Sequence, residues 1–127
     1  MKRLIMLAAG LILCNSLSAF SEREIFVRSD AMDKDIPVTV ITPDGYDERK
    51  SYPVVYVLHG FSDDHRIWIK KGVVGDLADQ YDVLAVMPDG GFSSWYWDSP
   101  VMPEYKYETF IISELVPYID KTYSTVA

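Results

Sequence analysis

The residues best placed to do chemistry form the tripeptide His59-Gly60-Phe61, which directly follows the apolar run Val54–Leu58. Backbone N–H groups at such a position can point at an oxygen that gains negative charge when a carbonyl is attacked. Glycine supports this geometry because it lets the chain turn sharply and approach a ligand closely. By itself the tripeptide is only a weak signal for half of an oxyanion hole, the donor site that acyl-transfer reactions need.

The other titratable residues near this tripeptide give weaker signals. His59 and His65 are the only histidines, and they are too few and wrongly spaced for a zinc site. The adjacent acids Asp63 and Asp64 are typical of a solvated loop, and His65 is expected to be solvated there too. Asp89 stands between a proline and a glycine, which favours turn chemistry over catalysis. We therefore predict no metal ion and no cofactor.

Two buried strands and the helix between them must position this site. Val54–Leu58 and Val83–Met87 are continuous apolar runs, which is typical of strands buried on both faces of a parallel sheet. Apolar residues at helical spacing predict a helix near 72–80, which Gly72 keeps from starting earlier. The pattern predicts a βαβ unit as the core. Val54–Leu58 is expected to form an apolar sheet edge, which favours aggregation.

Further elements flank the βαβ unit. The β-branched segments Glu24–Arg28 and Ile36–Thr42 predict two strands that pair antiparallel. Residues 88–107 show no regular pattern, and their aromatic side chains argue against disorder. Apolar residues at helical spacing predict a helix over 108–123. Pro117 lies inside this helix and predicts a kink or a local break. The sequence therefore predicts an α/β fold with a mostly parallel sheet and flanking helices.

The first 21 residues differ in composition from the rest of the chain. A basic start is followed by the apolar run Leu4–Leu13 and then by small residues, which is the layout of a secretory signal peptide. A membrane anchor is disfavoured because a span takes about 20 apolar residues. We predict a signal peptide over 1–21, cleaved after Ser18 or Ser21. The remainder, 22–127, is then secreted or periplasmic, with no stable membrane span.

Charge and cysteine content narrow the class of protein further. The formal net charge is −7, so there is no basic patch to neutralise phosphates, and a nucleic-acid partner is disfavoured. Cys14 is the only cysteine and lies in the predicted leader. The rest of the chain therefore has no disulfide and no thiol nucleophile.

Three ordered blocks resemble the putative-esterase family of α/β-hydrolases, which includes S-formylglutathione hydrolases, feruloyl and acetyl-xylan esterases, and mycolyltransferases. Residues 52–60 (YPVVYVLHG) are similar to the family signature YPVVYLLHG. Residues 87–99 resemble its MPDGG…SWYxDS block, and residues 108–119 resemble its ETFxxxELxPYI helix. The resemblance runs from about Ile25 to Ala127 and implies the N-terminal part of an α/β-hydrolase fold.

The resemblance implies serine-dependent ester hydrolysis. A serine on a strand-to-helix elbow attacks the carbonyl, a histidine acts as base, and an acid orients the histidine. The family carries this serine in Gly-x-Ser-x-Gly after the 108–119 helix, and the present sequence contains no such motif. We therefore expect the serine, the acid and the histidine beyond Ala127. The chain is predicted to be truncated before the nucleophile elbow and inactive by itself.

The resemblance also assigns roles within the chain. The oxyanion N–H falls on Phe61, and a loop aromatic that only packs is the alternative. His59 precedes the elbow in sequence, so it is expected to shape the oxyanion loop rather than to act as the base. Trp95, Tyr96 and Asp98 combine rings with a carboxylate, which suits a sugar or phenolic substrate. Anchoring of the loop by its tryptophans is an equally weighted alternative.

The function predicted from the sequence is an exported hydrolase of small or carbohydrate-linked esters, of acetyl or feruloyl type. An acyltransferase of the mycolyltransferase type is the alternative enzyme. A non-catalytic homologue that binds a glycan or a partner is the non-enzymatic alternative.

Overall fold

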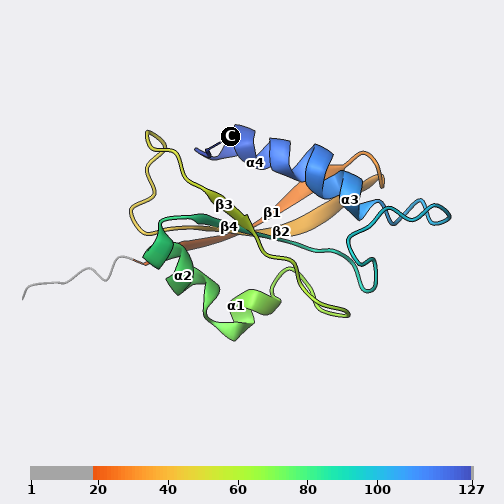
Figure 1. Ribbon diagram of the computed structural model, residues 1–127, viewed down its shortest axis with the longest axis horizontal. Coiled ribbons are helices and arrows are strands. Elements are labelled where there is room, and N and C mark those ends of the chain that lie inside the picture. Colours follow the sequence, from red (N-terminus) through yellow and green to blue (C-terminus); the bar gives the residue numbers. More distant parts are fainter. Residues whose placement is uncertain (1–18, 127) are drawn as a thin grey trace, which may run out of the picture.

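The computed structural model describes residues 19–126, so the predicted leader lies outside the described residues except at its last positions. Four strands form one sheet in the order β1-β2-β4-β3 (Figure 1). They are β1 (Ser21–Ser29), β2 (Lys34–Thr42), β3 (Val54–Tyr56) and β4 (Leu84–Pro88). β1 pairs antiparallel with β2, as predicted, and β2 pairs antiparallel with β4. β3 and β4 are parallel, so the described strands form a mixed sheet.

The sheet separates two apolar layers because side chains alternate along each strand. Val38, Val40 and Val86 face the C-terminal helices and join one core cluster. Ile41, Ala85 and Met87 face the opposite side and join a second cluster with α2 (Val74–Tyr81). β4 is buried along its whole length, as the continuous apolar run predicted. Helices therefore cover both faces of the sheet (Figure 1).

The parallel pair β3–β4 is joined by two short helices, which confirms the predicted βαβ unit. α1 (Ile67–Lys71) ends at Gly72, whose φ of 77° lies in the left-handed region that glycine adopts readily. α2 then begins at Val74, so the predicted helix near 72–80 is confirmed from that point on.

β3 differs from its prediction in length and in burial. It spans residues 54–56 rather than 54–58, although the N–H of Val57 still donates to the Val86 carbonyl at 2.9 Å. Its predicted position at the sheet edge is confirmed. Burial on both faces is wrong, because Val55 is 48% exposed.

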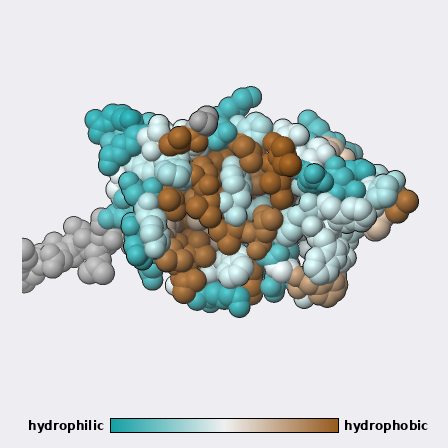
Figure 2. Space-filling model, viewed as in Figure 1, coloured by the Kyte–Doolittle hydropathy of each residue, from teal (hydrophilic) through white to brown (hydrophobic). Residues whose placement is uncertain are grey.

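Apolar side chains gather on the face that carries β3 (Figure 2). They border a groove of about 530 Å³ between β3 and the helices α1 and α2. A further pairing begins just before β3, where Tyr52 forms an isolated parallel bridge with Thr125. The Tyr52 N–H donates to the Ser124 carbonyl at 3.0 Å, and the Val126 N–H donates to the Tyr52 carbonyl at 2.9 Å.

The C-terminal helical segment is continuous but not uniform. α3 (Tyr107–Thr109) leads into the π-helical turn η1 (Phe110–Leu115) and then into α4 (Val116–Thr122). Pro117 lies in the first turn of α4 and has no N–H to donate to the preceding turn. The predicted local break therefore takes the form of a π-helical turn, a common way for a helix to absorb such a defect.

Phe20, the residue before β1, is tied to α2. The N–H of Phe20 donates to the Asp79 carboxylate at 3.2 Å, and the Phe20 ring packs against the cluster under α2. The ring fills the space beside Gly75, where an added Cβ would lie 2.1 Å from a ring carbon. Phe20 therefore belongs to the folded domain although the sequence analysis placed it in the leader.

Replacing Gly75 by alanine tests this packing. Alanine normally stabilises a helix by up to about 1 kcal/mol over glycine. Here the Cβ would collide with Phe20, so we expect Gly75→Ala to lower the free energy of unfolding in urea by about 1–3 kcal/mol. In a Phe20→Ala background the collision is absent, and the same change should stabilise the protein. A stabilising Gly75→Ala with Phe20 intact would contradict the packing.

Candidate functional site

The carboxyl ends of β3 and β4 lie side by side because the two strands are parallel and adjacent. The loops that follow them enclose a hollow of about 120 Å³. Its lining combines three glycines with aromatic and small polar residues: His59, Gly60, Phe61, Gly90, Gly91, Phe92, Ser93, Ser94, Trp95 and Tyr96. Ligands of α/β proteins commonly bind at this end of the strands. The hollow is therefore the candidate functional site.

His59 links the loop after β3 to the loop after β4, and both of its ring nitrogens are hydrogen-bonded. The residue is 6% exposed. Its Nε2 accepts the Gly90 N–H at 2.8 Å, so the ring proton resides on Nδ1, which lies 2.8 Å from the Gly60 carbonyl. His59 therefore bridges the two strand ends through hydrogen bonds at both ring nitrogens.

Tyr96 closes the same junction from the second loop. Its hydroxyl accepts the His59 N–H at 2.9 Å and donates to the His59 carbonyl at 3.2 Å. The ring lies edge-on to the His59 imidazole, with 5.6 Å between the ring centroids. Burial raises the pKa of Tyr96 to about 12, so the hydroxyl stays protonated at neutral pH. Tyr96 lines the hollow, but its hydroxyl is already bonded to the main chain.

Glycine at position 90 is a steric requirement of this junction. A Cβ added there would lie 2.3 Å from the nearest Tyr96 ring carbon. The Gly90 carbonyl also accepts a hydrogen bond from the Ser94 hydroxyl, which in turn accepts the Tyr96 N–H at 3.0 Å. Ser94 is buried and was not singled out in the sequence, because its role depends on contacts that only the folded loop creates.

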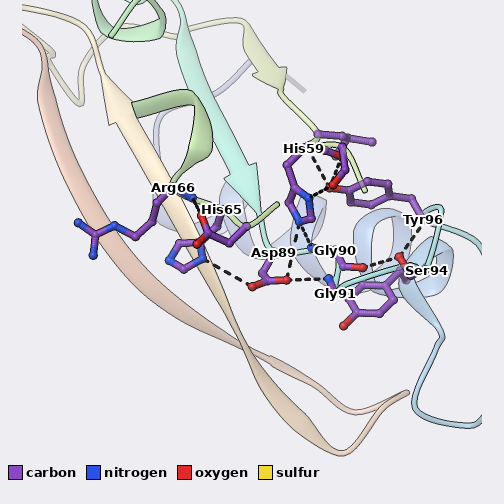
Figure 3. A network of polar contacts seen from close by, with 12 residues as sticks. His59, His65, Arg66, Asp89, Gly90, Gly91, Ser94 and Tyr96 are labelled. Carbon is purple, nitrogen blue, oxygen red and sulfur yellow. Dashed lines mark hydrogen bonds and ion pairs between the residues drawn. The ribbon is translucent and has the colours of Figure 1, made fainter. Parts of the chain in front are cut away.

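A chain of polar contacts extends from the hollow through Asp89 to His65 (Figure 3) and continues to Glu24 of β1. Asp89 accepts the Gly91 N–H at 2.6 Å, which confirms its predicted role in a turn. Its carboxylate also lies 3.8 Å from His59 Nε2 and 3.7 Å from His65 Nδ1. His65 Nε2 in turn lies 2.9 Å from the Glu24 carboxylate.

The prediction that His65 is solvated is wrong. Its side chain is only 12% exposed, because it is enclosed between Glu24 and Asp89. Glu24 is 41 positions away in the sequence, so no local pattern could have shown this contact.

Phe61 presents the backbone group that the sequence singled out. Among residues 19–126 its N–H donates to no protein group, although the next N–H, that of Ser62, donates to the Phe92 carbonyl at 2.9 Å. The Phe61 ring is 57% exposed and contacts the Phe92 ring at 4.9 Å and the Trp95 ring at 6.4 Å between centroids. The structure therefore brings Phe61, Trp95 and Tyr96 together at the hollow.

Asp98 does not join them. Its carboxylate accepts the Thr109 N–H at 3.0 Å and the Thr109 hydroxyl at 2.6 Å, outside the hollow. The hydroxyl, followed by the N–H, holds the pKa of the Asp98 carboxyl below its usual range. Asp98 therefore anchors the loop to the first turn of the C-terminal helical segment.

Two further kinds of feature are absent from the described part of the chain. No group of three or more histidine, cysteine or acidic side chains is arranged to hold a metal ion. No helix between residues 19 and 126 is long and apolar enough to cross a membrane.

The sheet with helices on both faces and the hollow at its strand ends are features of an α/β-hydrolase fold. Solved structures agree. A ferulic acid esterase matches 86% of this chain with a TM-score of 0.75 and 28% identity, over 45% of its own length. An S-formylglutathione hydrolase from Agrobacterium tumefaciens shares the fold, with a TM-score of 0.76 over 88% of this chain and 47% of its own, at 18% identity.

Residues 29–127 match the family model described as "Putative esterase", and the chain belongs to this family. An esterase of Mycobacterium tuberculosis strain H37Rv is 36% identical over 95 residues, 71% of this chain and 21% of the relative. A diacylglycerol acyltransferase/mycolyltransferase of Mycobacterium gordonae is 36% identical over 76 residues, 53% of this chain and 22% of the relative. The chain thus spans about a fifth of the length of these relatives and under half of the solved esterases.

Removing the Tyr96 hydroxyl tests whether its hydrogen bonds to His59 stabilise the junction between the ends of β3 and β4. Tyr96→Phe deletes two hydrogen bonds to His59, so we expect the free energy of unfolding at pH 7 to fall by about 1–3 kcal/mol. The folded-state pKa is raised, so the native protein keeps a proton that the unfolded chain releases near pH 10. The stabilising contribution of the protonated Tyr96 hydroxyl is therefore fully present below pH 10 and is lost between pH 10 and about 12. When urea unfolding is measured across that range, the free energy of unfolding should fall less steeply with pH in Tyr96→Phe than in the unchanged protein. An identical pH dependence of the two proteins would contradict the buried, hydrogen-bonded state of the Tyr96 hydroxyl.

Replacing Asp98 by alanine separates anchoring from substrate binding. Loss of the cap on Thr109 should cost about 0.5–2 kcal/mol of stability at pH 7. The pKa of Asp98 is lowered in the folded state, so this contribution is present at neutral pH and fades as the pH falls below about 4. The KM of the full-length protein for an ester substrate should stay unchanged in Asp98→Ala. A raised KM at unchanged stability would instead place Asp98 at the substrate.

Proposed function

We propose that the protein carrying this chain is an exported, serine-dependent carboxylic-ester hydrolase that acts on small or carbohydrate-linked esters. One observation carries the proposal: the Phe61 N–H, in the loop that follows β3, has no protein partner among the described residues and lies beside a hollow that could admit an ester. Membership of the esterase family supports the same chemistry.

In the proposed reaction the Phe61 N–H is one of the donors to the carbonyl oxygen of the ester. A serine hydroxyl attacks the carbonyl carbon, a histidine takes the serine proton, and the oxygen becomes negatively charged. A fixed N–H stabilises this charge without having to reorient. His59, Tyr96 and Gly90 supply the rigidity, since their mutual hydrogen bonds and contacts fix the peptide that precedes Gly60.

The proposal takes the serine, the acid and the catalytic histidine from elsewhere in the protein. This sequence has no Gly-x-Ser-x-Gly, and both nitrogens of His59 are engaged. Residues 22–127 are then the N-terminal part of the esterase domain, inactive without the remainder.

Two observations support an ester that carries a phenolic acyl group or a sugar. The solved structure with 28% identity is a ferulic acid esterase. The exposed rings of Phe61, Phe92 and Trp95 offer a surface that suits a flat phenolic or sugar group.

An acyltransferase is the second candidate function, because a mycolyltransferase is among the relatives. Both functions would use the Phe61 donor in the same way, and they differ in whether water or a sugar hydroxyl accepts the acyl group. A serine-less, glycan-binding homologue is the third candidate and would show no turnover of any ester.

Hydrolysis of p-nitrophenyl acetate by the full-length protein tests the proposed donor. Phe61→Pro removes the N–H, and we expect kcat to fall by about 10²–10³-fold, as for the loss of an oxyanion-hole donor elsewhere. Phe61→Ala keeps the N–H and is the matched control, with kcat close to that of the unchanged protein. Equal kcat values for the two folded variants would contradict the role of the Phe61 N–H.

N-terminal sequencing of the exported protein tests the proposed leader. Cleavage after Ser18 leaves Ala19 at the terminus and keeps Phe20, whose ring packs against α2. Cleavage after Ser21 would remove Phe20 and expose the surface under it. We therefore expect the mature protein to begin at Ala19, and a terminus at Glu22 or an uncleaved chain would contradict this.

A further inference from the structure

We propose that His65 is a positioning residue for the Phe61 N–H, the proposed oxyanion donor. Its imidazole is held between the carboxylates of Glu24 on β1 and Asp89 after β4, and we call these three side chains the His65 clamp. His65 does not line the hollow, so it acts through the backbone of its loop and not on the substrate. The inference rests on the proposed function, because it names what holds the donor of that same site in place.

The peptide that carries the Phe61 N–H has to be fixed on both sides, because a donor stabilises developing charge only when it is already aligned. The junction at His59 fixes the chain before this peptide. After Phe61, Ser62 adopts a φ of 63°, in the left-handed region that is unfavourable for a residue with a side chain. Such a conformation persists only where the surrounding structure enforces it. The chain after Phe61 therefore needs a hold of its own.

Two successive turns connect the donor peptide to the clamp. The Asp63 N–H donates to the Gly60 carbonyl at 3.2 Å and closes the first turn. The Arg66 N–H donates to the Asp64 carboxylate at 2.8 Å and closes the second turn. A displacement of the clamp is therefore transmitted to Phe61 instead of being absorbed by a slack loop.

The clamp joins this loop to parts of the sheet that are distant in the sequence. His65 Nε2 donates to the Glu24 carboxylate at 2.9 Å, since a carboxylate can only accept. His65 Nδ1 faces the Asp89 carboxylate at 3.7 Å and has no hydrogen-bond partner among the described residues (Figure 3). Asp89 is itself tied to the sheet, because its N–H donates to the Pro37 carbonyl of β2 at 2.9 Å.

The enclosure of His65 contrasts with the exposure of its own loop. Ser62, Asp63 and Arg66 are exposed, whereas the His65 side chain is only 12% exposed. The neighbouring ion pair of Arg66 with Glu24 is 3.9 Å long and lies in solvent, where such pairs contribute little. Solvent screens an enclosed contact much less. The imidazole, and not the guanidinium, is therefore the group that holds the loop to β1.

The clamp lies on the opposite side of the sheet from β3. The strand order places β1 and β3 at opposite edges. Glu24 stands opposite Thr39 of β2, and Thr39 stands opposite Met87 of β4, so these three side chains share one face. The loop after β3 therefore reaches across β4 and β2 toward β1, and His65 fastens its far point.

Hydrolysis of p-nitrophenyl acetate by the full-length protein tests the clamp. His65→Ala should lower kcat about tenfold at unchanged KM, because a displaced donor loses transition-state stabilisation while the ester still binds. Glu24→Ala should have the same effect, and Glu24→Gln, which keeps an acceptor for the Nε2 proton, should restore kcat. Glu22→Ala is the matched control, since Glu22 lies on the same strand face, is exposed, and makes no side-chain polar contact within residues 19–126.

A double variant tests whether the two residues act as one unit. Glu24→Ala combined with His65→Ala should show the kcat of His65→Ala alone, because both changes remove the same contact. Reductions in kcat that multiply would give the two residues separate roles and overturn the clamp. Urea unfolding shows that each variant is folded, and Glu24→Ala replaces His65→Ala in every comparison if His65→Ala does not fold.

The mobility of the Phe61 amide gives a second readout that needs no catalysis. The order parameter of this N–H from nuclear magnetic relaxation should be about 0.85 in the unchanged protein and below about 0.6 in His65→Ala. Loss of this order in a protein that hydrolyses no ester would uphold the clamp and reject the ester hydrolase. Ester hydrolysis with the same kcat and the same order parameter in folded His65→Ala would overturn the clamp and leave the proposed function standing.

Discussion

The site depends on the junction between the ends of β3 and β4, where the Tyr96 hydroxyl pairs with both main-chain groups of His59. The His59 imidazole completes the junction by accepting the Gly90 N–H. Two loops that the chain connects only through α1, α2 and β4 thereby become one rigid surface. The direction of the unpaired Phe61 N–H, the shape of the hollow and the placement of the aromatic rings all follow from this junction.

The junction also explains why unfavourable local features persist. Two consecutive aromatic residues adopt positive φ values, and the polar side chain of His59 is buried. Each of these costs free energy by itself. Hydrogen bonds from Ser94, Gly90 and Tyr96 offset the cost, and a glycine at 90 leaves room for the Tyr96 ring. The polar chain through Asp89, His65 and Glu24 braces the same loop against β1.

Much of the fold was predictable from local patterns. The continuous run at Val83–Met87 predicted the buried strand β4, Gly72 predicted the late start of α2, and Pro117 predicted the break that appears as a π-helical turn. What could not be predicted depends on contacts distant in the sequence. The enclosure of His65 requires Glu24 on β1, and the anchoring of Asp98 requires Thr109. Tyr96 points toward His59 because Trp95 and Tyr96 adopt positive φ angles, and neither tryptophan nor tyrosine predicts such an angle.

The central claim is that the Phe61 N–H is a donor to the oxyanion. The most direct test is a crystal structure of the full-length protein after reaction with a fluorophosphonate, whose phosphonyl oxygen occupies the place of the oxyanion. We expect the Phe61 nitrogen to lie about 2.7–3.1 Å from that oxygen. A phosphonyl oxygen bound by other N–H groups, with the Phe61 nitrogen beyond hydrogen-bond distance, would contradict the account.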